Sequence, residues 1–93
     1  MKRERFANVW DAVEDDPAMA ENLKLRSSLM IELKRHIQRE QLAQAQAAKL
    51  LGVTQPRISN LMRGKIEAFS LDILVKMAVA AGLRVTLRVQ KAA

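Results

Sequence analysis

The stretch from Gln44 to Leu61 constrains the fold more than any other part of the sequence. Gly52 interrupts a run of helix-forming residues and allows the positive φ of a sharp turn. Ala48 is small, which lets two helices cross closely just before that glycine. Apolar residues on both sides of the turn are spaced to fill the angle between the helices: Leu51, Val53, Ile58 and Leu61. The stretch is therefore predicted to form two short helices, at about 44–51 and 55–63, joined by a tight turn.

This arrangement has the spacing of a helix-turn-helix motif, in which the second helix enters the major groove of DNA. The charge distribution agrees with that interpretation. The chain carries a net charge of +6, and residues 42–66 contain four basic side chains and no acidic one. A positive surface of this kind attracts the phosphate backbone. An ordinary helical hairpin that matches the motif by chance is the alternative, but motif and charge together favour DNA binding.

Two further helices are predicted on either side of the motif. Asp16 and Pro17 are start signals for a helix that reaches about Glu40, while Ser70 caps a last helix that ends at Gly82. The long helix has an apolar stripe that is expected to be buried: Leu23, Met30, Leu33 and Ile37. Its basic residues are expected to face water: Arg26, Lys34 and Arg35.

Both ends of the chain show their own patterns. Near the N-terminus, apolar side chains recur at the spacing of one helix face: Phe6, Val9, Trp10 and Val13. After Gly82 the pattern changes to the alternation of a strand, with apolar positions at Leu83, Val85, Leu87 and Val89. A lone strand has unpaired backbone groups, so pairing with the same strand of a second copy across a two-fold axis is expected. The sequence therefore predicts a homodimer.

Composition argues against several other classes of protein. Cysteine is absent, and His36 is the only histidine, with no second catalytic group near it in sequence. The chain is therefore predicted to be no enzyme, with no catalytic residue, no metal site and no cofactor. No stretch approaches the roughly 20 apolar residues of a membrane span, and no signal peptide is recognisable. We expect a cytoplasmic protein without a membrane partner.

Several stretches spread over the chain match a known family pattern: Asn8–Asp11, Glu21–Ser27, Ala47–Asn60, Arg63–Lys65, Phe69–Asp72 and Gly82–Val85. On these residues the chain resembles the XRE-type, phage-repressor-like helix-turn-helix family, and it is most similar to HigA-like antitoxins of toxin–antitoxin pairs. The expected fold is all-α, with five helices and one C-terminal strand that pairs across a dimer. An N-terminal amphipathic segment (1–16) precedes the helix-turn-helix domain (17–82), and a strand and tail (83–93) follow it. Ala43 departs from the family, whose members usually carry a capping Thr or Ser there.

The resemblance also implies roles for individual residues. It assigns Gln44 to a phosphate contact that braces the second helix of the motif, and it places Gln55, Arg57 and Asn60 on that helix's exposed face. Arg pairs with guanine, and Gln or Asn with adenine, through two hydrogen bonds, so these three are the predicted base contacts. Further phosphate contacts are predicted at Lys49, Ser59, Arg63 and Lys65. The alternatives are a solvated basic face for the three cations and a plain surface amide for Asn60.

The N-terminal apolar face has two interpretations. It packs on its own domain or on the dimer partner, or it contacts a toxin through Phe6, Val9, Trp10 and Val13. Neighbouring acidic residues would complement a basic ribonuclease surface. The family resemblance implies such a toxin, an mRNA-cleaving enzyme encoded beside this protein.

Three functions stay open on the sequence alone. The first is an antitoxin that binds a double-stranded DNA operator, represses its own operon and neutralises its toxin. The second is a stand-alone XRE-type repressor without a toxin partner. The third is a structural or RNA-binding basic module, which is disfavoured because three aromatic residues provide no stacking platform for single-stranded RNA.

Overall fold

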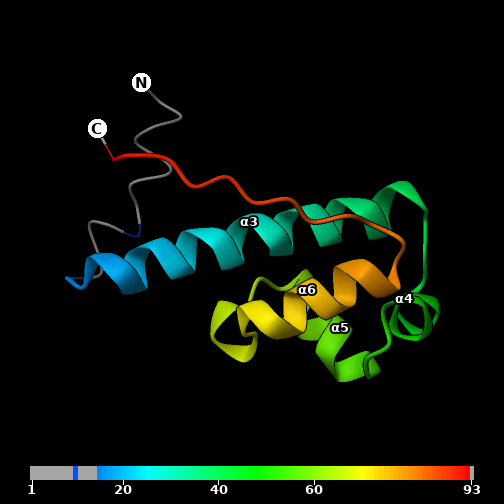
Figure 1. The fold of residues 1–93 in the computed structure, drawn as a ribbon. Helices are drawn as coiled ribbons and strands as arrows, with labels where there is room; N and C mark the ends of the chain where they lie inside the picture. Colours follow the sequence, from blue (N-terminus) through cyan, green and yellow to red (C-terminus); the bar gives the residue numbers. More distant parts are fainter. Residues whose placement is uncertain (1–9, 11–14, 93) are drawn as a thin grey trace.

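The computed structural model describes Trp10 and residues 15–92. Its α-helices, connected in the order shown in Figure 1, are α3 (Pro17–Arg39), α4 (Gln44–Leu51), α5 (Gln55–Met62) and α6 (Leu71–Ala80), with a 3-10 turn, η1 (Ile66–Ala68), before α6. The four helices predicted between residues 17 and 82 are confirmed, close to their expected bounds. The fifth predicted helix lies in the N-terminal segment, of which only Trp10, Asp15 and Asp16 are among the described residues.

Side-chain caps define where the helices begin. Asp16, Thr54 and Ser70 each accept a hydrogen bond from a backbone N–H of the helix they precede, at 3.0, 3.3 and 3.2 Å. Helix α4 starts after Ala43, which has no capping side chain, as the sequence indicated. The Oε1 of Gln46 instead accepts from the Ala43 backbone N–H at 2.8 Å. Gln46 thus supplies one half of a capping box and partly compensates for the alanine.

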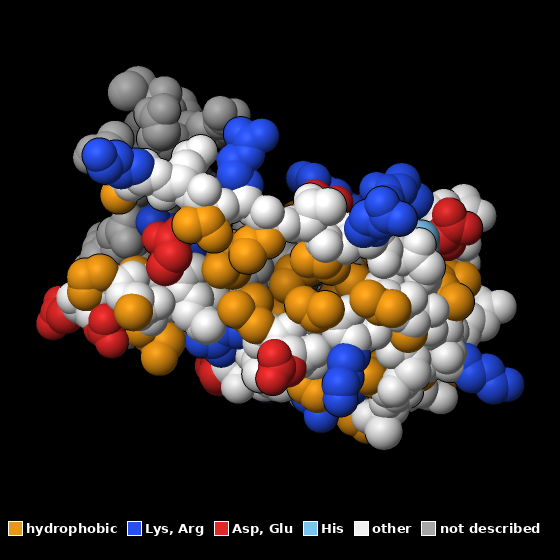
Figure 2. All heavy atoms as spheres, viewed as in Figure 1, with side chains coloured by type: hydrophobic (Ala, Val, Ile, Leu, Met, Phe, Trp, Pro, Cys, Tyr) orange, Lys and Arg blue, Asp and Glu red, His pale blue; other side chains and the backbone are white. Residues whose placement is uncertain are grey.

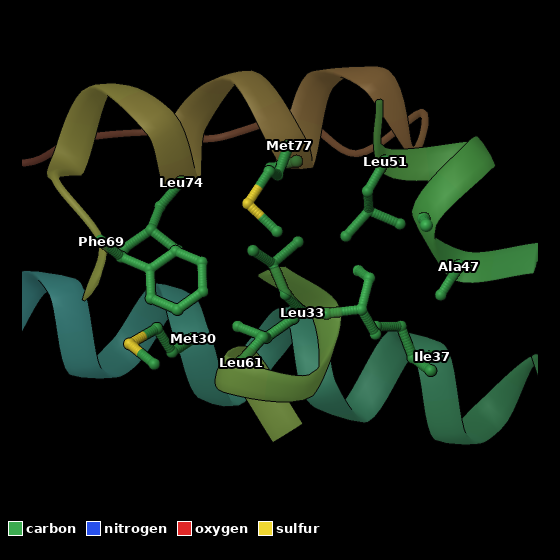
Figure 3. Packing of buried hydrophobic residues seen from close by; sticks show 12 residues of the cluster. Met30, Leu33, Ile37, Ala47, Leu51, Leu61, Phe69, Leu74 and Met77 are labelled. Atoms are coloured by element: carbon green, nitrogen blue, oxygen red, sulfur yellow. The ribbon is translucent and has the colours of Figure 1, made fainter. Parts of the chain in front are cut away.

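One hydrophobic cluster joins all four helices (Figure 3). In that view, Leu74 and Met77 of α6 point down toward α3, which contributes Met30 and Leu33, and Leu61 of α5 reaches into the same cluster. The predicted buried stripe of α3 is confirmed at three of its four positions, because Leu23 is only half-buried. The fully buried ring of Phe69 and the side chain of Leu74 belong to the same cluster. The core therefore fixes α4 and α5 against the layer formed by α3 and α6.

The expectation that Arg26 faces water is wrong. Its side chain is half-buried, and its Nη1 donates to the carbonyl oxygens of Phe69 at 3.1 Å and of Ile66 at 3.4 Å. Its Nε donates to the Oδ1 of Asn22, one turn earlier in α3, at 2.7 Å. The carbonyls around η1 lie outside the regular hydrogen bonding of a longer helix, so a guanidinium with several donors can satisfy them. Arg26 thereby ties α3 to the turn that precedes α6.

The strand predicted at Leu83, Val85, Leu87 and Val89 is not formed in the single chain, as far as residues 83–92 are described. The Leu83 backbone N–H bonds to the Ala78 carbonyl at 2.9 Å, but among the described residues no backbone-to-backbone bond follows from residue 84 to residue 92. This segment instead runs alongside α3 toward the N-terminal end of that helix (Figure 1). The physical reason is that a strand needs a second strand for its ladder, and the described part of this chain offers none.

Replacing Arg26 by Met should destabilise the protein by about 1.5–3 kcal/mol, because hydrogen bonds from a charged donor to two carbonyls are lost while the aliphatic stem is kept. The midpoint of urea unfolding, at unchanged m-value, measures this effect. Arg35→Met is the matched control on the same helix, since Arg35 makes only an exposed ion pair with Glu32 at 3.2 Å. It should cost less than about 1 kcal/mol. Equal losses in the two variants would contradict the role given to Arg26.

Candidate DNA-contact surface

Helices α4 and α5 are joined by the tight turn that the sequence predicted. Gly52 ends α4 with φ of 71°, and the Val53 backbone N–H bonds to the Ala48 carbonyl at 2.9 Å. A Cβ added to Gly52 would meet nothing within 4 Å, so the position requires glycine for its left-handed backbone and not for space. Ala47 and Ala48 are both buried where the helices approach. Both Ala47 and Ala48 therefore occupy positions at this crossing that require a small residue.

Helix α5 has one buried side and one open side. Ile58 and Leu61 are its buried residues, and both belong to the core. At 3.6 residues per turn, the opposite side is centred near Pro56 and Arg63, with Ser59 and Asn60 on either side of them and Gln55 at its border. Gln55 and Arg63 are exposed, whereas Ser59 and Asn60 are half-buried.

Two polar side chains on the open side of α5 form a pair. The Nη2 of Arg63 donates to the Oδ1 of Asn60 at 3.0 Å, one turn earlier in the chain. The carboxamide of Asn60 is therefore oriented by a partner, and its amide NH₂ is not used in that bond. A hydrogen-bond partner of this kind pre-orients a side chain for contact with a ligand.

Arg57 is turned away from this open side. Its Nη1 donates to the Ala68 carbonyl at 3.0 Å, and its Cζ lies 5.6 Å from the centre of the Phe69 ring. The side chain is half-buried. The structure therefore leaves Gln55 exposed and Asn60 oriented by Arg63, both outside the buried stripe of α5, but directs the guanidinium of Arg57 toward η1. Helical periodicity indicates this difference, because it places Arg57 at the edge of the buried stripe that contains Leu61.

The predicted phosphate contacts lie on α4, on α5 and directly after α5. Gln44 is the first residue of α4, Lys49 lies in the last turn of that helix, and Lys65 follows α5; all three are exposed. Arg63, the residue that ends α5, is also exposed. Glu67 is the first acidic residue after this region. The exposed cations thus lie on α4 and at the end of α5, whereas the exposed residues within α5 are Gln55 and Pro56, which carry no charge.

We also searched the described part of the chain for a metal site and for a membrane-spanning helix. Within it, no group of three or more His, Cys, Asp or Glu side chains is arranged to hold a metal ion. None of its helices is long and apolar enough to cross a membrane.

The fold and this surface define a helix-turn-helix protein, and comparison with protein families agrees. A family model described as a helix-turn-helix domain matches residues 12–90, which is most of the chain. The chain belongs to this helix-turn-helix domain family, and membership implies DNA binding. A search among curated proteins found no match.

Proposed function

We propose that this protein is a sequence-specific transcriptional regulator that acts as a homodimer on a DNA operator, by binding and without a catalytic step, in the cytoplasm. The observation that carries the proposal is the open side of α5, where Arg63 orients Asn60 and no core residue lies. Gln55 at the start of the helix is exposed, and so are the cations Lys49, Arg63 and Lys65. In this proposal α5 is the recognition helix, which lies in the major groove.

The two amide side chains suit the reading of bases. Gln and Asn can each form two hydrogen bonds with adenine in the major groove, and these bonds distinguish one base pair from the others. Ser59 and Gln44 can donate hydrogen bonds to phosphate oxygens. Lys49, Arg63 and Lys65 bring positive charge to the sugar–phosphate backbone, which supplies affinity on any sequence.

A homodimer is supported by the apolar character of the C-terminal segment. An open groove of about 530 Å³ lies between α3, α6 and residues 83–87. Hydrophobic side chains gather on this face (Figure 2), and several of them remain exposed: Val85 by 39%, Leu87 by 75% and Val89 by 86%. Pairing of this segment with its copy would cover these side chains and also satisfy its backbone groups.

The two-fold symmetry of the dimer would determine the symmetry of the operator. Two recognition helices related by a two-fold axis would enter successive major grooves on one side of the duplex, about 34 Å apart. The operator is therefore expected to be an inverted repeat.

The finer proposal is that the regulator is the antitoxin of a toxin–antitoxin pair. Its support is the acidic and apolar composition of the N-terminal segment, in whose sequence Asp11 and Glu14 follow Trp10. Such a segment suits a basic ribonuclease. Trp10, the one described residue of the proposed contact, is half-buried and lines a small pocket with Met30 and Ile31 of α3. Phe6, Val9 and Val13 lie outside the described residues. A stand-alone repressor remains the alternative.

Asn60→Ala should reduce affinity for the operator by about 1–3 kcal/mol and relax the preference at one base pair. Lys65→Ala should weaken operator and unrelated duplexes alike and reduce the salt slope of binding by about 1. Sequence selection by the wild type first defines the operator, and binding curves on single-base variants then measure both effects. Arg35→Ala removes an exposed charge from α3 and serves as the control. A base preference that Asn60→Ala leaves intact would refute the assignment.

The proposed dimer should have a solution mass of twice 10.5 kDa at micromolar concentration. Leu87→Lys should shift the mass toward the monomer, because its side chain is exposed in the single chain and would be buried in the dimer. Thr86→Lys adds the same charge at the alternate position and should leave the dimer intact. Light scattering distinguishes these states, and a monomeric wild type would contradict the proposal.

The antitoxin proposal is tested by co-expression with the product of the adjacent gene. The two proteins should co-purify, and the charge reversals Asp11→Lys and Glu14→Lys together should weaken the complex, while Glu21→Lys on α3 should not. Asp16 must be left unchanged in such variants because it caps α3. Operator binding without any complex in this assay would favour the stand-alone repressor.

A further inference from the structure

We propose that Arg57 is a positioning residue that sets the orientation of α5 for DNA, and that it does not read a base. This inference rests on the proposed DNA-binding function. It also replaces the role that sequence reasoning gave to Arg57, whose guanidinium type and place on the recognition helix pointed to guanine.

The contacts of Arg57 explain why its guanidinium stays within the protein. One nitrogen donates to the Ala68 carbonyl at 3.0 Å, while the cationic carbon lies 5.6 Å from the centre of the Phe69 ring. A planar guanidinium can stack on an aromatic ring and donate in its own plane at the same time. Turning the side chain toward DNA would give up both contacts in a half-buried place.

Phe69 is a fixed partner for the Arg57 guanidinium. Its side chain is only 2% exposed and is part of the core cluster, so the ring cannot follow Arg57 outward. Its backbone carbonyl accepts from Arg26 of α3 at 3.1 Å. The segment from Ile66 to Phe69 is thus held by one guanidinium from α3 and by another from α5.

Helix α5 needs this fixed contact because few of its own side chains are fully buried. It has eight residues, and only Ile58 and Leu61 are buried. The partly buried Met62 also packs against the core. Apolar contacts on one side of a short helix resist its separation from the core better than they resist rolling about the helix axis. Arg57 lies beside this stripe and adds a contact to a different element, η1. Rolling would move Gln55 and Asn60 together, so the contact of Arg57 governs how both amides meet the duplex.

The two possible roles of Arg57 predict different base-preference profiles. If Arg57 reads a base, the Arg57→Ala variant should lose its preference at one base pair and keep its preference at all other base pairs. If Arg57 is a positioning residue, the Arg57→Ala variant should bind the operator on the order of tenfold more weakly. Its base preference should weaken at several base pairs and disappear at none of them. The experiment is therefore to measure the affinity of wild type and variants for every single-base variant of the selected operator.

Phe69→Leu is the decisive second variant, because a buried ring cannot touch DNA. It should reproduce the profile of Arg57→Ala, and the double variant should be little worse than either single one. Met77→Leu is the matched control: it is a conservative change at a core position that Arg57 does not contact, and it should keep the wild-type profile. Circular dichroism and thermal unfolding establish that each variant is folded under the binding conditions.

Hydrogen exchange provides a readout that needs no DNA. Amide protons of α5 should exchange faster in Arg57→Ala than in the wild type, while those of α4 should change little. Loss of preference at one base pair in Arg57→Ala, with a wild-type profile in Phe69→Leu, would overturn this inference and leave the proposed function standing. A wild type that selects no sequence would overturn the proposed function itself, and unchanged exchange in α5 would separately reject the role of Arg57.

Discussion

The packing of α5 against the core is the interaction on which the rest of the structure depends. A helix of eight residues is marginal by itself in water, because too few hydrogen bonds repay its nucleation. Ile58 and Leu61 bury one side of α5, and the small residues Ala47 and Ala48 let α4 approach it. Gly52 provides the turn between the two helices. Only after this burial do the remaining polar residues of α5 form an ordered open side.

Two arginines extend that order beyond the apolar core. Arg26 and Arg57 donate to backbone carbonyls around η1, which lies between α5 and α6 in the sequence. The Ile66 carbonyl also accepts the Phe69 backbone N–H, whereas the carbonyls of Ala68 and Phe69 accept from the arginines. A guanidinium has enough N–H groups to serve several carbonyls. In a chain of net charge +6, these two cations therefore act within the fold, whereas Lys49, Arg63 and Lys65 are exposed.

The C-terminal segment shows how one pattern can be correct in composition and still not form the expected element. Its alternation of apolar and polar residues suits a strand, yet Val85 and Leu87 lie in the described single chain without a ladder of hydrogen bonds. Period-two alternation reports which side of a segment is apolar. It does not supply the neighbouring strand that the backbone groups require.

The sequence by itself determined the four helices from residue 17 to residue 82, the caps at Asp16 and Ser70, and the turn at Gly52, because these depend on local spacing and local hydrogen bonds. It also identified most of the core and the polar residues of α5. Only the tertiary structure decided where the guanidiniums of Arg26 and Arg57 point. Both donate to carbonyls around η1, which are distant from Arg26 in sequence and approach it only when the chain has folded. A long, flexible side chain takes its direction from such partners, and helical periodicity cannot predict them.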